Sequence, residues 1–264
     1  MSSPYVPPVG LVDLHSHLVP GVDDGTATIA ESLTALGGLA QQGVHTIVTT
    51  PHLLVPHLET DQEIGRALAT HRRAFESLLA VRAAHPDLPG LALGQEIWAP
   101  DAAAIRRVAR RADVGLNGDY LLVEFGFNLL GTHTDVIQET LDSGRGIVIA
   151  HPERYTYPSG QDSLELMQCW RGLGALLQIN VGSLTGHYER SSPGSEALAW
   201  RMVELDLVDL LATDHHGPRR AGVSPAEAWD ALMARGMGAL AQRAMIETPG
   251  AIIGGELPAS RLPG

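Results

Sequence analysis

Lysine is absent from this sequence of 264 residues, in which all 18 basic residues are arginine. The chain therefore cannot carry the phosphate-binding lysine of a P-loop protein or a lysine that forms a Schiff base. Cysteine occurs once, as Cys169, which excludes a framework of disulfide bonds within the chain. No stretch approaches the roughly 20 uninterrupted apolar residues of a membrane-spanning helix, so insertion into a membrane is not expected.

Two enzyme classes that depend on a side-chain nucleophile lack their motifs here. Cysteine-based tyrosine phosphatases carry an arginine six residues after the cysteine, but Ala175 stands at that distance from Cys169. The Gly-x-Ser-x-Gly turn of serine α/β-hydrolases does not occur in the sequence either. Any catalytic chemistry therefore has to come from other residue types.

The charge balance and the first residues limit partners and location. A net charge of −12 argues against nucleic acid as a partner, because duplex binding depends on clustered basic side chains. Residues 1–10 contain neither the basic region nor the apolar region of a secretion signal. We therefore expect a soluble cytoplasmic protein. The sequence predicts no oligomeric state.

Short apolar runs alternate along the chain with longer segments of helical spacing. Such continuous runs are typical of strands buried on both faces of a parallel sheet. Strands are expected over Leu11–Leu14, Thr46–Thr49, Leu91–Leu93, Leu121–Val123, Ile147–Ala150, Leu176–Ile179 and Leu210–Thr213. Helices are expected over Ile29–Gln42, Asp61–Ala84, Pro100–Arg111, Asp135–Ser143, Ser163–Leu173, Ser195–Leu205 and Pro225–Arg235.

These seven repeats show no break in composition. They favour one α/β domain over residues 1–264, folded as a TIM-like (β/α)7 barrel rather than a doubly wound sheet. The ends, at about 1–9 and 255–264, are expected to be loose.

Metal-capable side chains follow six of the seven predicted strands. Because the C-terminal strand ends of a barrel share one face, these side chains are expected to meet there. His15 and His17 are two residues apart, so they face the same way along an extended segment. Glu96 and Asp214 are placed to bridge neighbouring ions, as in two-metal phosphoester hydrolysis. The other strand-end residues of this kind are Asp13, Asp23, Asp24, His52, Glu124, His151, Glu153 and His216.

Each of these residues also has an ordinary structural explanation. A single His or Asp near a strand end is more often a solvated loop residue, but the joint occurrence at six strand ends favours a metal site. Imidazole and carboxylate ligands suit divalent manganese, iron and zinc. His215 is expected to point away from the cluster, and Trp98 either shapes substrate choice or packs on the barrel rim. No role is assigned to His45, His57, His71, His85, His133 or His187.

Five short motifs give the sequence its resemblance to a known family. They are Asp13-Leu14-His15-Ser16-His17, Pro20-Gly21-Val22-Asp23-Asp24-Gly25, Thr50-Pro51-His52, His151-Pro152-Glu153-Arg154-Tyr155 and Thr213-Asp214-His215-His216. The chain resembles the polymerase and histidinol phosphatase (PHP) superfamily from Leu11 to about Ile253. Within it, the chain is most similar to the CpsB/CapC-like bacterial tyrosine-protein phosphatases of capsular and exopolysaccharide biosynthesis.

This resemblance implies a distorted seven-stranded barrel that holds three divalent ions, manganese or iron, with zinc as an alternative. Arg154 would hold the substrate phosphate together with a second arginine, which is either Arg219 or Arg220. The implied metal ligands are His15, His17, Asp24, His52, Glu96, Glu124, His151, Asp214 and His216.

The implied activity is hydrolysis of phosphotyrosine by a metal-activated hydroxide. His52, His151 or a metal-bound water would protonate the leaving phenolate. The expected substrate is a phosphotyrosine-bearing protein or peptide, in particular the tail of a tyrosine autokinase that controls polysaccharide synthesis. Two alternatives remain open: a phosphatase for a small phosphomonoester such as histidinol phosphate, and a non-catalytic metal-bearing PHP module.

Overall fold

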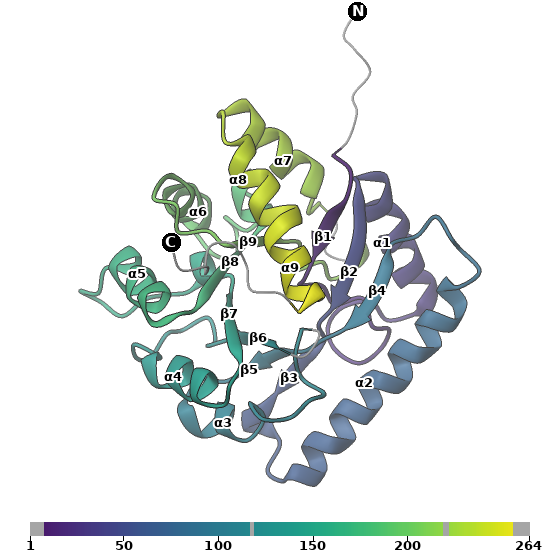
Figure 1. The fold of residues 1–264 in the computed structure, drawn as a ribbon, viewed down its shortest axis with the longest axis horizontal. Coiled ribbons are helices and arrows are strands. Elements are labelled where there is room, and N and C mark those ends of the chain that lie inside the picture. Colours follow the sequence, from purple (N-terminus) through teal and green to yellow (C-terminus); the bar gives the residue numbers. More distant parts are fainter. Residues whose placement is uncertain (1–7, 117–118, 219–221, 256–264) are drawn as a thin grey trace, which may run out of the picture.

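The computed structural model describes residues 8–116, 119–218 and 222–255 (Figure 1). Most of the two ends expected to be loose, 1–9 and 255–264, therefore lies outside the described residues. Among the described helices, none has both the length and the apolar character needed to cross a membrane.

The strands are short, parallel and arranged in two sheets. One sheet has the order β1-β2-β4 and the other the order β3-β5-β6-β7-β8-β9. Strands β6, β7 and β8 are almost wholly buried along their length, as expected for parallel strands covered on both faces. The strands are β1 (Leu11–Asp13), β2 (Val44–Thr49), β3 (His52–Leu54), β4 (Gly90–Leu93), β5 (Glu96–Trp98), β6 (Tyr120–Glu124), β7 (Gly146–Ala150), β8 (Leu176–Asn180) and β9 (Leu210–Ala212).

Helices surround the strands on the outside (Figure 1). Helices α1 and α2 pack on β2 and β4, while α4 and α5 pack on β7 and β8. The α-helices are α1 (Ile29–Gln41), α2 (Asp61–Arg82), α3 (Ala102–Arg106), α4 (Thr134–Asp142), α5 (Ser163–Leu173), α6 (Ser195–Glu204), α7 (Pro225–Ala234), α8 (Gly238–Gln242) and α9 (Thr248–Gly254). Short helical turns lie at η1 (Val55–His57), η2 (Pro152–Arg154) and η3 (Val181–Thr185), and a π-helical turn, η5 (Arg243–Glu247), joins α8 to α9.

Backbone hydrogen bonds connect the two sheets at the edge where the strands end. Ser16, after β1, forms a parallel bridge with His215, after β9. On either side of that bridge, Asp214 N donates to the carbonyl of His15 at 2.8 Å, and His17 N donates to the carbonyl of His215 at 2.8 Å. The segments that follow the first and the last strand are therefore held side by side.

Two hydrophobic cores support this arrangement. The larger one lies between the strands and the helices, and the smaller one joins side chains from strands of both sheets to Ile252 of α9. Val48 of β2, Leu122 of β6 and Leu210 of β9 all belong to the smaller core. Because these strands come from different sheets, this core lies on the faces that the two sheets turn toward each other.

The structure confirms the α/β class and the parallel strands but not a single closed sheet of seven. Each predicted strand coincides with an observed one, while β3 and β5 were not expected. They follow β2 and β4 after the interruptions at Thr50-Pro51 and Gly94-Gln95. Proline has no N–H to donate to a ladder, which accounts for the first break. The helix expected over Pro100–Arg111 is also shorter than predicted, since α3 covers only Ala102–Arg106.

Candidate functional site

The structure brings the nine expected metal ligands together at the ends of the strands. They form four overlapping groups in which one ligand atom per residue lies within 4.8 Å of the others. The groups are His17, Asp24, His52 and His216; His15, Glu96 and His151; His15, His17 and Asp214; and His52, Glu96 and Glu124.

The backbone positions several of these side chains firmly. His52 of β3 and Glu96 of β5 are register partners, so their side chains lie next to each other on one sheet face. His151 (φ 34°) and Asp214 (φ 51°) directly follow β7 and β9 and adopt left-handed backbone conformations. Such conformations are unfavourable for residues other than glycine, and they concentrate at functional sites.

Hydrogen bonds set the orientation of three histidine rings. Nδ1 of His17 donates to Oδ2 of Asp23 at 2.8 Å, and Nδ1 of His216 donates to the backbone carbonyl of Asp214 at 2.8 Å. Nδ1 of His15 donates to Oε1 of Gln178 at 2.9 Å. In each ring Nε2 is therefore the nitrogen left to face the cluster, which is the usual arrangement of a metal-binding histidine.

A row of buried amides links His15 to Asp214. Gln178 and Asn180 occupy alternate positions of β8, so they share one face of the strand. Nε2 of Gln178 donates to Oδ1 of Asn180, and Nδ2 of Asn180 donates to Oδ2 of Asp214, both at 2.8 Å. We call Gln178 and Asn180 the amide relay, because they connect two members of the cluster through consecutive hydrogen bonds.

The spacing of the donor atoms fits divalent ions. Nε2 of His15 and Nε2 of His17 are 3.3 Å apart, and they lie 3.5 and 3.3 Å from Oδ1 of Asp214. Oδ1 of Asp24 lies 3.4 Å from Nε2 of His52 and 3.4 Å from Nε2 of His216. Ligands about 2.0–2.2 Å from one tetrahedral ion are about 3.3–3.6 Å from each other. Both groups therefore have the spacing that a shared ion requires.

Strong electrostatic coupling is visible in the pKa shifts of the cluster. Burial alone would lower the pKa of His17, but hydrogen bonds to Asp214 and Asp23 raise it well above its usual value. Burial would lower the pKa of His52 as well, yet Glu96 and Asp24 raise it to about 10. Burial, reinforced by the charge of Glu96, raises the pKa of Glu124 to about 7. The pKa values of Asp24, Glu96 and Asp214 are lowered instead, because neighbouring histidines favour their charged forms. The cluster therefore pairs imidazole rings with carboxylates that carry negative charge.

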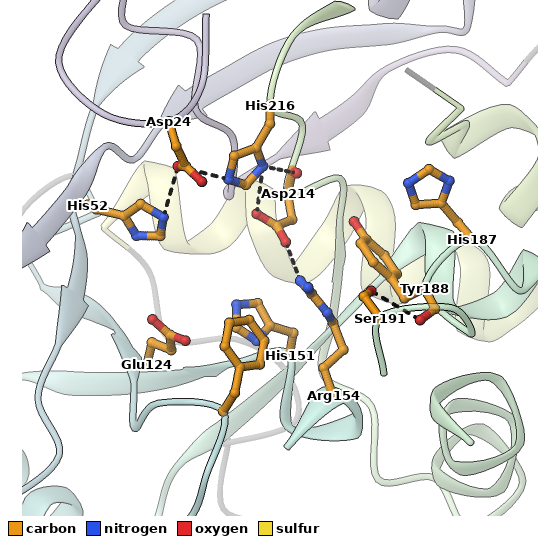
Figure 2. A pocket seen from close by; sticks show the side chains of 11 residues that line it. Asp24, His52, Glu124, His151, Arg154, His187, Tyr188, Ser191, Asp214 and His216 are labelled. Atoms are coloured by element: carbon orange, nitrogen blue, oxygen red, sulfur yellow. Dashed lines mark hydrogen bonds and ion pairs between the residues drawn. The ribbon is translucent and has the colours of Figure 1, made fainter. Parts of the chain in front are cut away.

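A cavity of about 580 Å³ opens beside the cluster. Figure 2 shows Arg154 reaching across it toward Asp214, and Nη1 of Arg154 donates to Oδ2 of Asp214 at 2.7 Å. The Arg154 guanidinium carbon lies 4.1 Å from the ring centroid of Tyr188 and 4.9 Å from that of Phe127. The contacts with these two rings hold the guanidinium in place, and its Nη1 remains beside the cluster.

Some lining residues were not expected from the sequence. Phe127, His187, Tyr188 and Ser191 line the cavity. His187, to which the sequence assigned no role, therefore lies beside the cluster. These residues lie in loops and short turns, where the sequence carries no periodic signal. His52 and His151, the expected proton donors, both line the cavity as well.

The remaining predictions have separate outcomes. His215 is outside every metal-capable group found among the described residues, and its Nδ1 accepts a hydrogen bond from Gly217 N. Trp98 does not line the cavity of Arg154 but a neighbouring one. Arg219 and Arg220 lie outside the described residues, so the second phosphate-binding arginine stays a prediction.

Comparisons with known proteins agree on one family. The chain matches the family model described as capsular polysaccharide synthesis, CpsB/CapC, over residues 11–253. It is 29% identical over 221 residues to the tyrosine-protein phosphatase YwqE of Bacillus subtilis (strain 168), with 83% of this chain and 82% of that protein covered. It is 27% identical over 257 residues to the tyrosine-protein phosphatase CpsB of Streptococcus pneumoniae, with 92% and 98% covered.

A solved structure gives the same result for the fold. It comes from work on YwqE from Bacillus subtilis and CpsB from Streptococcus pneumoniae, described as unique metal-dependent tyrosine phosphatases. The TM-score is 0.77 at 24% sequence identity, and the match covers 94% of this chain and 96% of that chain. Together with the sequence match, this confirms the resemblance drawn from the five motifs: the chain belongs to the CpsB/CapC family of capsular polysaccharide synthesis.

Proposed function

We propose that this chain is a metal-dependent protein-tyrosine phosphatase. The observation that carries the proposal is Arg154, whose guanidinium contacts two aromatic rings and the Asp214 carboxylate of the cluster. A guanidinium fork suits a phosphoryl group, because two parallel N–H groups can bind two of its oxygens. The tyrosine-protein phosphatases among its relatives support the same activity.

We propose three divalent ions as cofactors, manganese or iron, with zinc as an alternative. When bound, such ions activate water at neutral pH and neutralise charge on the phosphoryl oxygens. Their proposed ligands are His15, His17, Asp24, His52, Glu96, Glu124, His151, Asp214 and His216. In the same way, the hydrogen bonds between the ends of β1 and β9 support the distorted seven-stranded PHP barrel as the underlying architecture.

The side chains around the cavity have separate tasks in this proposal. Arg154 binds and orients the phosphoryl group, while Phe127 and Tyr188 keep the guanidinium from turning away. His52 and His151 line the same cavity, and one of them or a metal-bound water would donate a proton to the leaving phenolate. Because a phenolate leaves with a pKa of about 10, it needs less protonation than an alkoxide.

The open side of the cluster favours a peptide over a small metabolite. The side chain of Asp24 is 48% exposed and that of His52 is 24% exposed, whereas His15 and His17 are fully buried. Phe127 at the cavity wall is 45% exposed. A phosphotyrosine that extends from a flexible chain can reach such a site. We propose the tail of a tyrosine autokinase as the substrate and a cytoplasmic location for the reaction.

The proposed activity has a direct test. Purified protein with added Mn²⁺ is expected to hydrolyse p-nitrophenyl phosphate, to lose that activity in EDTA and to regain it when Mn²⁺ is returned. Iodoacetamide should have no effect, because Cys169 lies on α5, away from the cavity. Activity that survives EDTA but not iodoacetamide would contradict the proposal. A phosphotyrosine peptide is expected to be a better substrate than histidinol phosphate.

Removing the amide relay should weaken the site without emptying it. Asn180→Ala deprives Asp214 of one hydrogen bond and leaves Gln178 without its acceptor. Loss of partners that orient metal ligands typically costs about 10–100-fold in metal affinity or activity. We expect a decrease of that size in Mn²⁺ affinity, measured by calorimetry.

The two members of the relay should also be coupled. Gln178→Ala alone is expected to weaken Mn²⁺ binding. In the double variant, the fold-decrease in Mn²⁺ affinity should be smaller than the product of the two single fold-decreases. Gln138→Ala, a change in an exposed amide of α4, serves as the control. If the two fold-decreases simply multiply, Gln178 and Asn180 are not coupled through their hydrogen bonds.

A further inference from the structure

A second cavity, of about 500 Å³, adjoins the first on the side of Asp24, His52 and Glu124. Figure 2 shows these three side chains together, across the first cavity from His187 and Tyr188. The rest of the second cavity is mainly apolar. Its remaining lining residues are Val22, Asp23, Leu54, Trp98, Gly126 and Phe127. We call Leu54, Trp98 and Phe127 the apolar shelf.

The strands place the shelf directly beside the cluster. Leu54 is two residues beyond His52 on β3, and Trp98 is two residues beyond Glu96 on β5. Residues two apart on a strand share a face and lie about 7 Å apart. Leu54 and Trp98 are themselves register partners. The face that carries two proposed metal ligands therefore continues outward as an apolar surface.

The floor of the shelf is fixed by close packing. Gly126, just after β6, has a left-handed φ of 93°, and a Cβ added there would lie 3.0 Å from Nε1 of Trp98. Trp98 is also the register partner of Glu124 at the end of β6. By contrast, Leu54 is 39% exposed and Phe127 is 45% exposed. The indole is held in place while the shelf remains open to an incoming side chain.

We propose that the apolar shelf binds an apolar side chain next to the phosphotyrosine of the substrate, and so selects among phosphopeptides. This inference rests on the proposed function. A phosphate held at the cluster by Arg154 places the flanking residues of the peptide within reach of the second cavity, because the two cavities share Asp24, His52, Glu124 and Phe127. The lining favours a leucine-like or aromatic side chain over an acidic one, since Asp23 and Asp24 repel acidic residues and no polar group on Leu54 or Phe127 compensates a buried negative charge.

The test uses a glycine–serine peptide with one phosphotyrosine and the Mn²⁺-loaded protein. Leucine is placed in turn at each position from two before to two after the phosphotyrosine. At one or more positions it should raise kcat/KM roughly tenfold, the effect of burying one aliphatic side chain. Trp98→Ala and Leu54→Ala should each remove most of this gain. Leu79→Ala on α2 is the matched control, because Leu79 is also 39% exposed.

The outcomes separate this inference from the proposed function. Hydrolysis of p-nitrophenyl phosphate without any preference for leucine would overturn the shelf alone, as would a preference that survives both substitutions. If Trp98→Ala and Leu54→Ala lower kcat/KM equally toward p-nitrophenyl phosphate and toward the peptides, the shelf binds the phosphorylated ring itself. That result would overturn the inference. If the wild-type protein does not hydrolyse p-nitrophenyl phosphate with Mn²⁺, the proposed function fails and this inference falls with it. Leu54→Ala changes a partly exposed residue, so the test does not depend on Trp98→Ala folding.

Discussion

Glu96→Gln is expected to lower kcat/KM toward p-nitrophenyl phosphate by about a thousandfold, because a lost metal site removes several kcal/mol of transition-state stabilisation. Glu96 belongs to two of the four donor groups, one with His15 and His151 and the other with His52 and Glu124. Its Oε2 lies 2.8 Å from Nδ1 of His52 and 3.3 Å from Nε2 of His15. An amide of the same shape keeps the packing but removes the charge that binds the cation.

Metal content provides the second readout for Glu96→Gln. A ligand that binds only the native state raises the unfolding temperature, so the wild-type protein should be stabilised by Mn²⁺. The variant is expected to bind fewer ions per chain and to show a smaller increase in Tm. Glu76→Gln, in an exposed residue of α2, should behave like the wild type in both measurements. Full metal content and full activity in Glu96→Gln would remove Glu96 from the proposed ligand set.

The parts of the fold that the sequence predicted are those with a strong local pattern. Buried parallel strands give unbroken apolar runs, and each of the seven runs became a strand. Strands β3 and β5 escaped prediction because each has three residues and begins with a polar side chain, His52 or Glu96. Helices α8 and α9 escaped for another reason: the π-helical turn between them shifts the helical period, and Pro249 lies inside the segment.

In the candidate site, too, only the residues that follow a local sequence pattern could be predicted. The rule that the ends of parallel strands share a face predicted that metal-capable side chains would gather there, and the resemblance to the PHP superfamily selected the nine proposed ligands among them. The residues that orient them depend on which side chain meets which in space. Asp23 was counted among the strand-end metal-capable residues, but nothing in the sequence indicated that it accepts the hydrogen bond from His17. Gln178 and Asn180 interrupt an apolar strand at alternate positions, and this was the only available signal for the amide relay.

Arg154→Lys is expected to separate phosphate binding from metal binding. Lysine keeps the positive charge but loses the flat fork that can bind two oxygens and stack on Tyr188 and Phe127. Removing one preorganised donor to a developing charge typically costs about 10²–10³-fold in rate, and we expect a loss of that size in kcat/KM. Inhibition by inorganic phosphate should weaken as well, because phosphate presents the same oxygens in the ground state.

Metal binding should not share these losses. Nη1 of Arg154 lies 2.7 Å from Oδ2 of Asp214, whereas the oxygen of Asp214 that faces Nε2 of His15 and His17 is Oδ1. The Mn²⁺-induced increase in Tm of Arg154→Lys should therefore equal that of the wild type, unlike that of Glu96→Gln. Arg66→Lys, in an exposed side chain of α2, should leave activity, phosphate inhibition and Tm unchanged. If Arg154→Lys loses metal together with activity, Arg154 supports the cluster and does not hold phosphate; unchanged inhibition by phosphate would move phosphate binding away from Arg154 altogether.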